Sequence, residues 1–201
     1  MQQCQGKTAK SVRCKRFVSG TYCYQHIPEK EEEWIRQGYP TPSSKIDEGH
    51  RRKIKSKLKR GPSQKDKEGY IYIYYLKTDK RVRYFKIGRT STTVEKRLKQ
   101  WEKESPSPPV LVESFKVKHS IFCERLIHLY LDYCRVYRYK VSKNRFCTVW
   151  KVSGECVTER DEKLKDRNRL EGMKKQTEWF AVKKKTALNL VKEIVELHST
   201  K

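Results

Sequence analysis

Four side chains that commonly bind metal ions lie within the first 26 residues, a stretch with too few apolar residues to form a core. They are Cys4, Cys14, Cys23 and His26, and the last two form a Cys-x2-His pair. Three thiolates and one imidazole complete the tetrahedral coordination of Zn²⁺ and leave no open position for a substrate. The spacing therefore predicts a structural zinc module over residues 1–27, in which the metal stabilises the fold.

The same segment resembles the small CxGxT...RC...YCxxH zinc modules found at the ends of fungal nucleic-acid proteins. The matching positions are Cys4, Gly6, Thr8, Arg13, Cys14, Tyr22, Cys23 and His26. The alternative is a disordered basic tail with incidental cysteines, which four ligand residues in so short a window disfavour. The chain has seven cysteines, an odd number that fits metal binding in a reducing, intracellular compartment better than a disulfide framework.

The charge of the chain indicates its partner. The 201 residues include 48 Lys and Arg against 24 Asp and Glu, a formal net charge of +24 that solubility does not require. Such a balance favours a polyanion, and nucleic acid, most simply DNA, is the expected partner. The sequence has no apolar run long enough to cross a membrane, so no membrane partner is expected. The oligomeric state stays open.

A basic run lies within residues 28–68, which we interpret as a linker or arm. Ile54 and Leu58 are four residues apart and would share one face of a helix. Such a run is typical of a nuclear localisation signal, of an arm that follows phosphates, or of a solvated flexible linker. We expect a nuclear protein whose basic run binds nucleic acid through Arg51, Arg52, Lys53, Lys55, Lys57, Lys59 and Arg60.

The main domain is predicted over residues 69–183. Alternating Tyr and Ile from Tyr70 predict a strand with its tyrosines on one face, and Thr92 and Glu95 form a capping-box pattern before a helix. Apolar periodicity predicts further elements. The expected strands are 70–78, 82–88, 110–118 and 177–182, and the expected helices are 93–103, 120–133 and an amphipathic one within 184–201.

Between these elements, residues 135–176 show weaker periodicity and more charge, so we interpret them as an insertion or extended loop with one charged helix near 161–173. Cys123 and Cys134 fall in the helical pattern and are expected to be core residues. The order of elements predicts a compact α+β domain whose small sheet is covered by helices.

Five segments of the main domain resemble the GIY-YIG nuclease superfamily. They are GYIYIYYL from Gly69, FKIGRT from Phe85, TTVEKRLKQW from Thr92, CERLIHLYL from Cys123 and TEWF from Thr177. The fit is best to the divergent branch that is named after a bacteriophage reading frame and is also seen in fungal meiotically up-regulated proteins. The resemblance implies a three-stranded mixed sheet flanked by helices, and phosphodiester hydrolysis at one divalent metal ion, Mg²⁺ or Mn²⁺.

The resemblance also implies roles for individual residues. Tyr72 would position or deprotonate the attacking water, Arg97 would bind the charged transition state, and Glu124 would hold the divalent cation. His128 lies one helical turn beyond Glu124 and completes the predicted catalytic set. Gly88 matches the glycine of the second motif, where we expect a phosphate to approach the backbone. Lys86 and Arg89, beside that glycine, are expected to bind nucleic acid.

Two positions depart from the superfamily pattern. Lys86 stands where most relatives have tyrosine, and Trp101 stands where many have histidine, so two groups that could transfer protons are missing. The leading hypothesis is a metal-dependent DNA endonuclease or repair-type nuclease. A non-catalytic DNA-binding protein on the same scaffold is the first alternative, and a structural or RNA-associated protein is the second.

Overall fold

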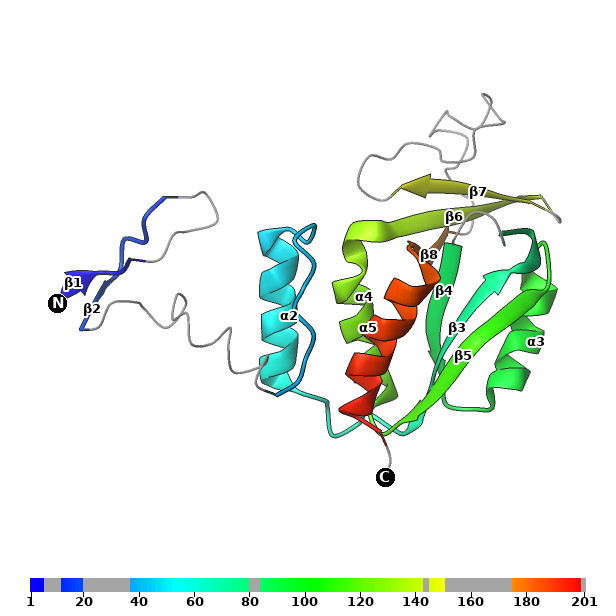
Figure 1. Ribbon diagram of the computed structural model, residues 1–201, viewed down its shortest axis with the longest axis horizontal. Coiled ribbons are helices and arrows are strands. Elements are labelled where there is room, and N and C mark those ends of the chain that lie inside the picture. Colours follow the sequence, from blue (N-terminus) through cyan, green and yellow to red (C-terminus); the bar gives the residue numbers. More distant parts are fainter. Residues whose placement is uncertain (6–11, 20–36, 80–83, 143–144, 151–174, 200–201) are drawn as a thin grey trace.

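The computed structural model describes residues 1–5, 12–19, 37–79, 84–142, 145–150 and 175–199. The chain begins with a short pair of strands, β1 (Gln2–Gln3) and β2 (Phe17–Val18), and then forms a domain of helices packed on a sheet (Figure 1). Its helices are α2 (Glu48–Arg60), α3 (Val94–Glu104), α4 (Ser120–Tyr130) and α5 (Lys184–Glu196), with 3-10 turns at Lys77–Asp79 and Asp132–Cys134. Its strands are β3 (Gly69–Leu76), β4 (Tyr84–Thr90), β5 (Pro109–Val117), β6 (Arg135–Ser142), β7 (Arg145–Trp150) and β8 (Lys175–Ala181).

The sheet corrects the prediction of a small three-stranded mixed sheet. In the described part of the chain it has six strands in the order β5-β3-β4-β8-β6-β7. Every neighbouring pair is antiparallel. The difference arises at residues 135–176, which we expected to form an insertion or loop, because β6 and β7 lie there and β8 begins there. The helix expected near 161–173 lies outside the described residues.

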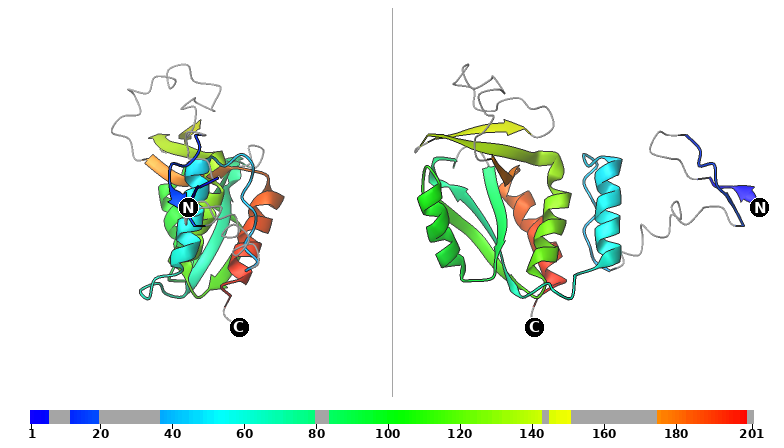
Figure 2. Two further views of the ribbon diagram at one scale, coloured as in Figure 1. Left: turned by 90° about the vertical axis from the view of Figure 1, so that its left-hand side faces the viewer. Right: turned by 180° about the vertical axis from the view of Figure 1, so that it is seen from behind.

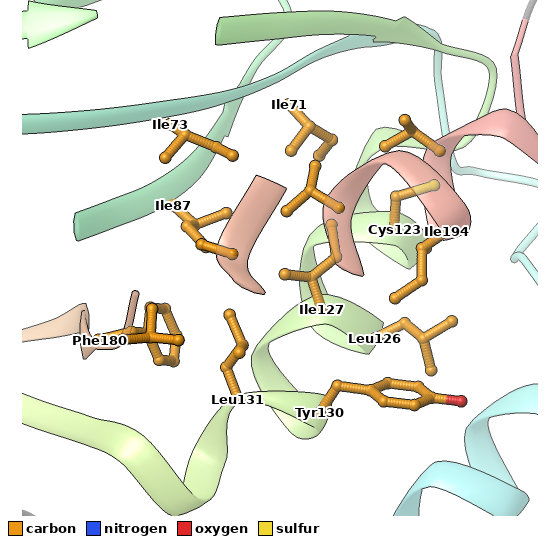
Figure 3. Packing of buried hydrophobic residues seen from close by; sticks show 14 of the residues in the cluster. Ile71, Ile73, Ile87, Cys123, Leu126, Ile127, Tyr130, Leu131, Phe180 and Ile194 are labelled. Carbon is orange, nitrogen blue, oxygen red and sulfur yellow. The ribbon is translucent and has the colours of Figure 1, made fainter. Parts of the chain in front are cut away.

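The two faces of the sheet carry different side chains, as the alternation in β3 predicts. Ile71 and Ile73 face a large apolar cluster shared with α4 and α5, shown in Figure 3. Tyr72 and Tyr74 face the opposite side and pack in a second cluster with Trp179 and Val94 of α3. The α+β class is therefore confirmed, with α4 and α5 on one face and α3 on the other (Figure 1).

Cys123 and Cys134 are buried in the larger cluster, as predicted. Burial raises the pKa of both thiols to about 12. Both side chains therefore stay protonated at neutral pH and serve as small apolar core residues.

The start of α3 differs from the predicted capping box by one residue. The N-cap is Thr93, whose hydroxyl accepts a hydrogen bond from the Lys96 amide at 3.4 Å. Thr92 instead lies in the turn before the helix, where its amide donates to the Thr90 hydroxyl at 3.1 Å. Two adjacent threonines offer equivalent caps by sequence, and the tight turn after β4 decides between them.

Helix α2 comprises the predicted basic residues from Arg51 to Arg60 and packs beside α4, as the right-hand view of Figure 2 shows. Ile54 is fully buried in the large cluster, and Leu58 packs against it. The pairing of these two residues on one helical face is thus confirmed. A solvated flexible linker is not what residues 48–60 form, although the division of the chain into four parts stays a prediction.

At the N-terminus, the described residues include only part of the predicted zinc module. The Cys4 amide donates to the Arg16 carbonyl at 2.8 Å beside the β1–β2 pair, and the side chains of Cys4 and Cys14 are buried. Cys23 and His26 lie outside the described residues. Within the described ranges no group of three or more potential metal ligands occurs, so the zinc module stays a prediction.

A search of the described residues for a membrane-spanning helix finds none that is long and apolar enough.

Candidate active site

A polar pocket of about 410 Å³ lies at the end of β4, beside α3 and α4. The described pairing of β4 with β8 covers Tyr84 to Lys86, so the next part of β4 borders the pocket on that side. Residues from three strands, two helices and one turn therefore meet there. The lining residues are Tyr72, Arg89, Thr90, Ser91, Thr92, Arg97, Gln100, Glu124 and Glu178.

Tyr72 projects from β3, and its hydroxyl accepts a hydrogen bond from the Trp101 indole at 3.0 Å. Burial raises the pKa of Tyr72, against the opposing effect of hydrogen bonds from Trp101 and Arg97 to the ionised form. The phenol therefore stays protonated at neutral pH. Because the hydroxyl oxygen of Tyr72 accepts the indole N–H through one lone pair, its own proton can still be donated to another group.

Gly88 faces Tyr72 directly across the β3–β4 pair. A Cβ atom added at Gly88 would lie 2.9 Å from the Tyr72 hydroxyl oxygen, a distance that real contacts do not tolerate. We expected this glycine to admit a phosphate to the backbone. Instead, the space that the missing side chain leaves is filled by the Tyr72 ring.

Arg97 is carried by α3, which starts immediately after the turn at the end of β4. Its guanidinium lies 4.8 Å from the centroid of the Trp101 ring and donates to the Gln100 side chain at 2.8 Å. These two contacts orient the planar group at the pocket wall. Gln100, which sequence analysis did not select, lies one turn after Arg97, and that spacing was the available signal.

Glu124 enters the pocket from α4 and is held by Arg89. One carboxylate oxygen accepts the Arg89 backbone N–H at 3.0 Å, and the other lies 3.4 Å from the Arg89 side chain. Burial, followed by repulsion from Glu178, raises the pKa of Glu124 to about 7, although Arg89 opposes the shift. The carboxyl group therefore changes charge near neutral pH, a property common in functional sites.

Glu178 is a second carboxylate in the pocket. It comes from β8 and lies 3.5 Å from the Lys86 ammonium. Its approach to Glu124 depends on β8 lying beside β4, a pairing between segments about 90 residues apart in the sequence. The TEWF segment has no alternation of polar and apolar residues, so the local pattern did not indicate that Glu178 lines the pocket.

The position of Lys86 corrects a prediction. We expected this residue to contact nucleic acid, but it is 1% exposed. Its ammonium lies 3.0 Å from the centroid of the Trp101 ring. Burial lowers its pKa to about 8, although Glu178 opposes this shift. Lys86 therefore contacts Trp101 and Glu178, and its buried ammonium group is not exposed to a ligand.

His128 does not join the pocket. Its Nε2 lies 2.8 Å from the Ile87 carbonyl oxygen, which makes Nε2–H the donor. Burial lowers its pKa to about 4, so the ring is neutral at pH 7. Asp132, in the 3-10 turn that follows α4, contacts Arg135 at 2.8 Å. Of these polar residues, only Glu124 lines the pocket.

The basic run of α2 separates into two groups. Arg52, Lys53, Lys57 and Arg60 line a groove next to α4, whereas Lys55 and Lys59 are not among its lining residues. Arg51 donates to the carbonyls of Ser43 and Ile46 and thereby holds the segment before the helix. Arg89 lines the pocket itself, with about one third of its side chain exposed.

The fold and the pocket together define an α+β domain in which a strand tyrosine, a helix arginine and a buried glutamate meet at one polar cavity. The family model of the T5orf172 domain matches residues 69–195, and the chain belongs to this family, which is related to the GIY-YIG nucleases. Neither the curated proteins nor the solved structures contain a significant match to this chain.

Proposed function

We propose that this protein is a metal-dependent DNA endonuclease that hydrolyses phosphodiester bonds in the pocket around Glu124. The observation that carries this proposal is the convergence of Tyr72, Arg97 and Glu124, from one strand and two separate helices, on one cavity of about 410 Å³. Family membership supports the same chemistry.

The arginines are suited to a phosphate group. Arg97 is oriented by Trp101 and Gln100, and Arg89 lies at the pocket wall near Glu124. A guanidinium offers several donors in one plane and stabilises the negative charge that grows on the phosphate oxygens during attack. Tyr72, as a protonated phenol, donates its hydrogen to the scissile phosphate or holds the attacking water.

Glu124 and Glu178 fit a divalent cation. Their carboxylates repel each other, and a group with a pKa near 7 readily loses its proton to a cation. Oxygen ligands with additional waters are what Mg²⁺ and Mn²⁺ prefer. When bound, the cation would neutralise charge on the phosphate and activate a water molecule. Glu124 would hold it, and Arg89 keeps that carboxylate in place.

The second candidate function is a DNA-binding protein without catalysis. The observations that favour it are the burial of Tyr72, which is 1% exposed, and the position of His128 outside the pocket. No imidazole reaches the cavity among the described residues, so proton transfer depends on Tyr72, the carboxylates and water.

A plasmid-nicking assay with Mg²⁺ or Mn²⁺ separates the two functions. The full chain is compared with Glu124→Gln, Arg97→Ala and Lys99→Ala, the last an exposed residue of α3 that does not line the pocket. Glu124→Gln and Arg97→Ala are expected to lower the nicking rate on the order of a hundredfold to a thousandfold. Lys99→Ala is expected to keep the wild-type rate.

Activity that is equal in all four proteins would show a contaminating nuclease and contradict the proposal. No nicking by any of them, with binding to DNA retained, would support the second candidate.

For the N-terminal segment we propose the structural zinc site of Cys4, Cys14, Cys23 and His26, together with binding of nucleic acid in the nucleus. The burial of Cys4 and Cys14 in the small hairpin supports the site. The metal content of the purified full chain tests it, because an amount of zinc well below equimolar would contradict a closed four-ligand site.

A further inference from the structure

A groove of about 1020 Å³ lies between α2 and α4, and it shares none of its described lining residues with the Glu124 pocket. Its lining includes four basic side chains from α2, one from α4 and one from the start of β6. These are Arg52, Lys53, Lys57, Arg60, Arg125 and Arg135. No carboxylate is among its lining residues in the described part of the chain. The groove thus concentrates a single sign of charge.

The groove is a fixed part of the fold because α2 is anchored along its length. At one end, His50 lies 2.7 Å from the Asp132 carboxylate just beyond α4. In the middle, Ile54 is fully buried. At the other end, Asp66 accepts the backbone N–H groups of Ile121 and Phe122 at 2.9 and 2.7 Å, which ties the segment after α2 to the start of α4.

The like charges in the groove work against the packing of the two helices. Lys57 lies 4.8 Å from the Phe122 ring centroid. Burial lowers the pKa of Lys57, and repulsion from Arg125 and Arg60 lowers it further. Since repulsion between facing cations costs stability, a bound polyanion that neutralises them would stabilise the folded chain.

We propose that the groove between α2 and α4 binds the sugar-phosphate backbone of DNA, next to the segment that enters the Glu124 pocket. This inference rests on the proposed function for the identity of the ligand and adds a binding site that lies partly outside the family-matched residues 69–195. Arg135 is paired with Asp132, but no carboxylate is among the described lining residues of the groove. Such a row of cations matches a row of phosphates, because each neutralised phosphate releases counterions. Helix α2 is then a substrate-binding element of this domain.

The test compares two pairs of lysines on the same helix. Lys53→Gln with Lys57→Gln removes two groove charges, and Lys55→Gln with Lys59→Gln removes two charges that do not line the groove. Both variants have the same composition and net charge. They are made in the full chain with Glu124→Gln, so that the DNA stays intact. Binding to a short fluorescent DNA duplex is measured by anisotropy over a series of KCl concentrations without added Mg²⁺.

The groove pair is expected to weaken binding on the order of tenfold or more at moderate salt and to reduce the slope of log affinity against log salt by about two. The off-groove pair is expected to cause a clearly smaller loss of affinity. Equal losses in the two pairs, or no loss in either, would overturn the inference. Circular dichroism checks the fold, and Arg125→Gln on α4 provides a second groove variant if Lys57→Gln disturbs α2.

Failure of the groove and failure of the nuclease give different results. A protein that nicks plasmid but shows no difference between the two lysine pairs retains the proposed function and loses the groove. A protein that does not nick but loses affinity selectively with the groove pair keeps the DNA site and loses catalysis.

Discussion

The pocket and the groove both border α4, and they differ in the charges that line them. In the pocket each carboxylate has a cation beside it, Arg89 near Glu124 and Lys86 near Glu178. In the groove the charged lining side chains are all cationic, and Arg135 among them is paired with Asp132, which does not line the groove. Paired charges can hold one group in one orientation, whereas a row of like charges suits a repeating anion. Under the two proposals made above, one helix would border both a site for a single phosphate and a surface for a polymer.

The largest expected effect concerns the anchoring of the groove. Ile54→Ala removes a fully buried side chain of α2 and is expected to lower the free energy of unfolding by about 3 kcal/mol. Lys59→Ala, on the same helix and exposed, is the control and is expected to cost less than about 0.5 kcal/mol. Urea denaturation measures both. If the two variants were equally stable, α2 would not belong to the cooperative fold and the groove would not be a fixed surface.

A smaller effect is expected from the charge of the pocket. The pKa of Glu124 is raised from its ordinary value of 4.5 to about 7, so the folded state favours the protonated acid. Its contribution to stability is full below about pH 4.5 and is lost as the pH rises through 7. Because glutamine stays neutral, Glu124→Gln is expected to be more stable than the wild type by about 2 kcal/mol above pH 7, without added metal.

Thermal denaturation over a pH series measures this difference, which should disappear towards pH 4.5. A stability difference that does not change with pH would show that Glu124 has an ordinary pKa, and would weaken its assignment as a cation ligand.

The smallest effect is expected at Lys86, the buried lysine beneath the pocket. Its pKa is lowered to about 8, so the stability that it contributes is lost as the pH falls through 8. Lys86→Met removes the charge and also its contacts with Trp101 and Glu178. The free energy of unfolding at neutral pH is expected to change by on the order of 1 kcal/mol. Relative to the wild type, the variant is expected to be more stable at pH 7 than at pH 10. If Lys86→Met lost stability relative to the wild type as the pH fell from 10 to 7, this description would be contradicted.

Local patterns predicted most of the fold. The alternation in β3 identified both faces of that strand, and the apolar period of α4 identified Cys123 as a core residue. The prediction failed at β6, where Val136 and Arg138 are both buried on a strand rich in charge. Arg138 lies 4.4 Å from the Trp179 ring centroid. In sequence, a cation that is buried against an aromatic ring looks like a solvated residue, so the pattern of this segment predicts an insertion or loop.

The sequence predicted those site residues that lie within a local motif of one strand or helix. Tyr72, Arg97 and Glu124 were selected from motifs and lie together in the pocket. The sequence could not indicate that Lys86 turns inward, because that depends on Trp101 from a different element. It also could not place Glu178, whose position depends on the non-local pairing of β4 with β8.

Successive residues of α4, Glu124 and Arg125, line the pocket and the groove, so both cavities border the same helix. With 3.6 residues per turn, the side chains of successive residues point about 100° apart around the helix axis. A strand held in the groove and cut in the pocket would therefore be cleaved at a set offset from its point of attachment. The helix would act as a spacer, and product ends of uniform length would be its signature.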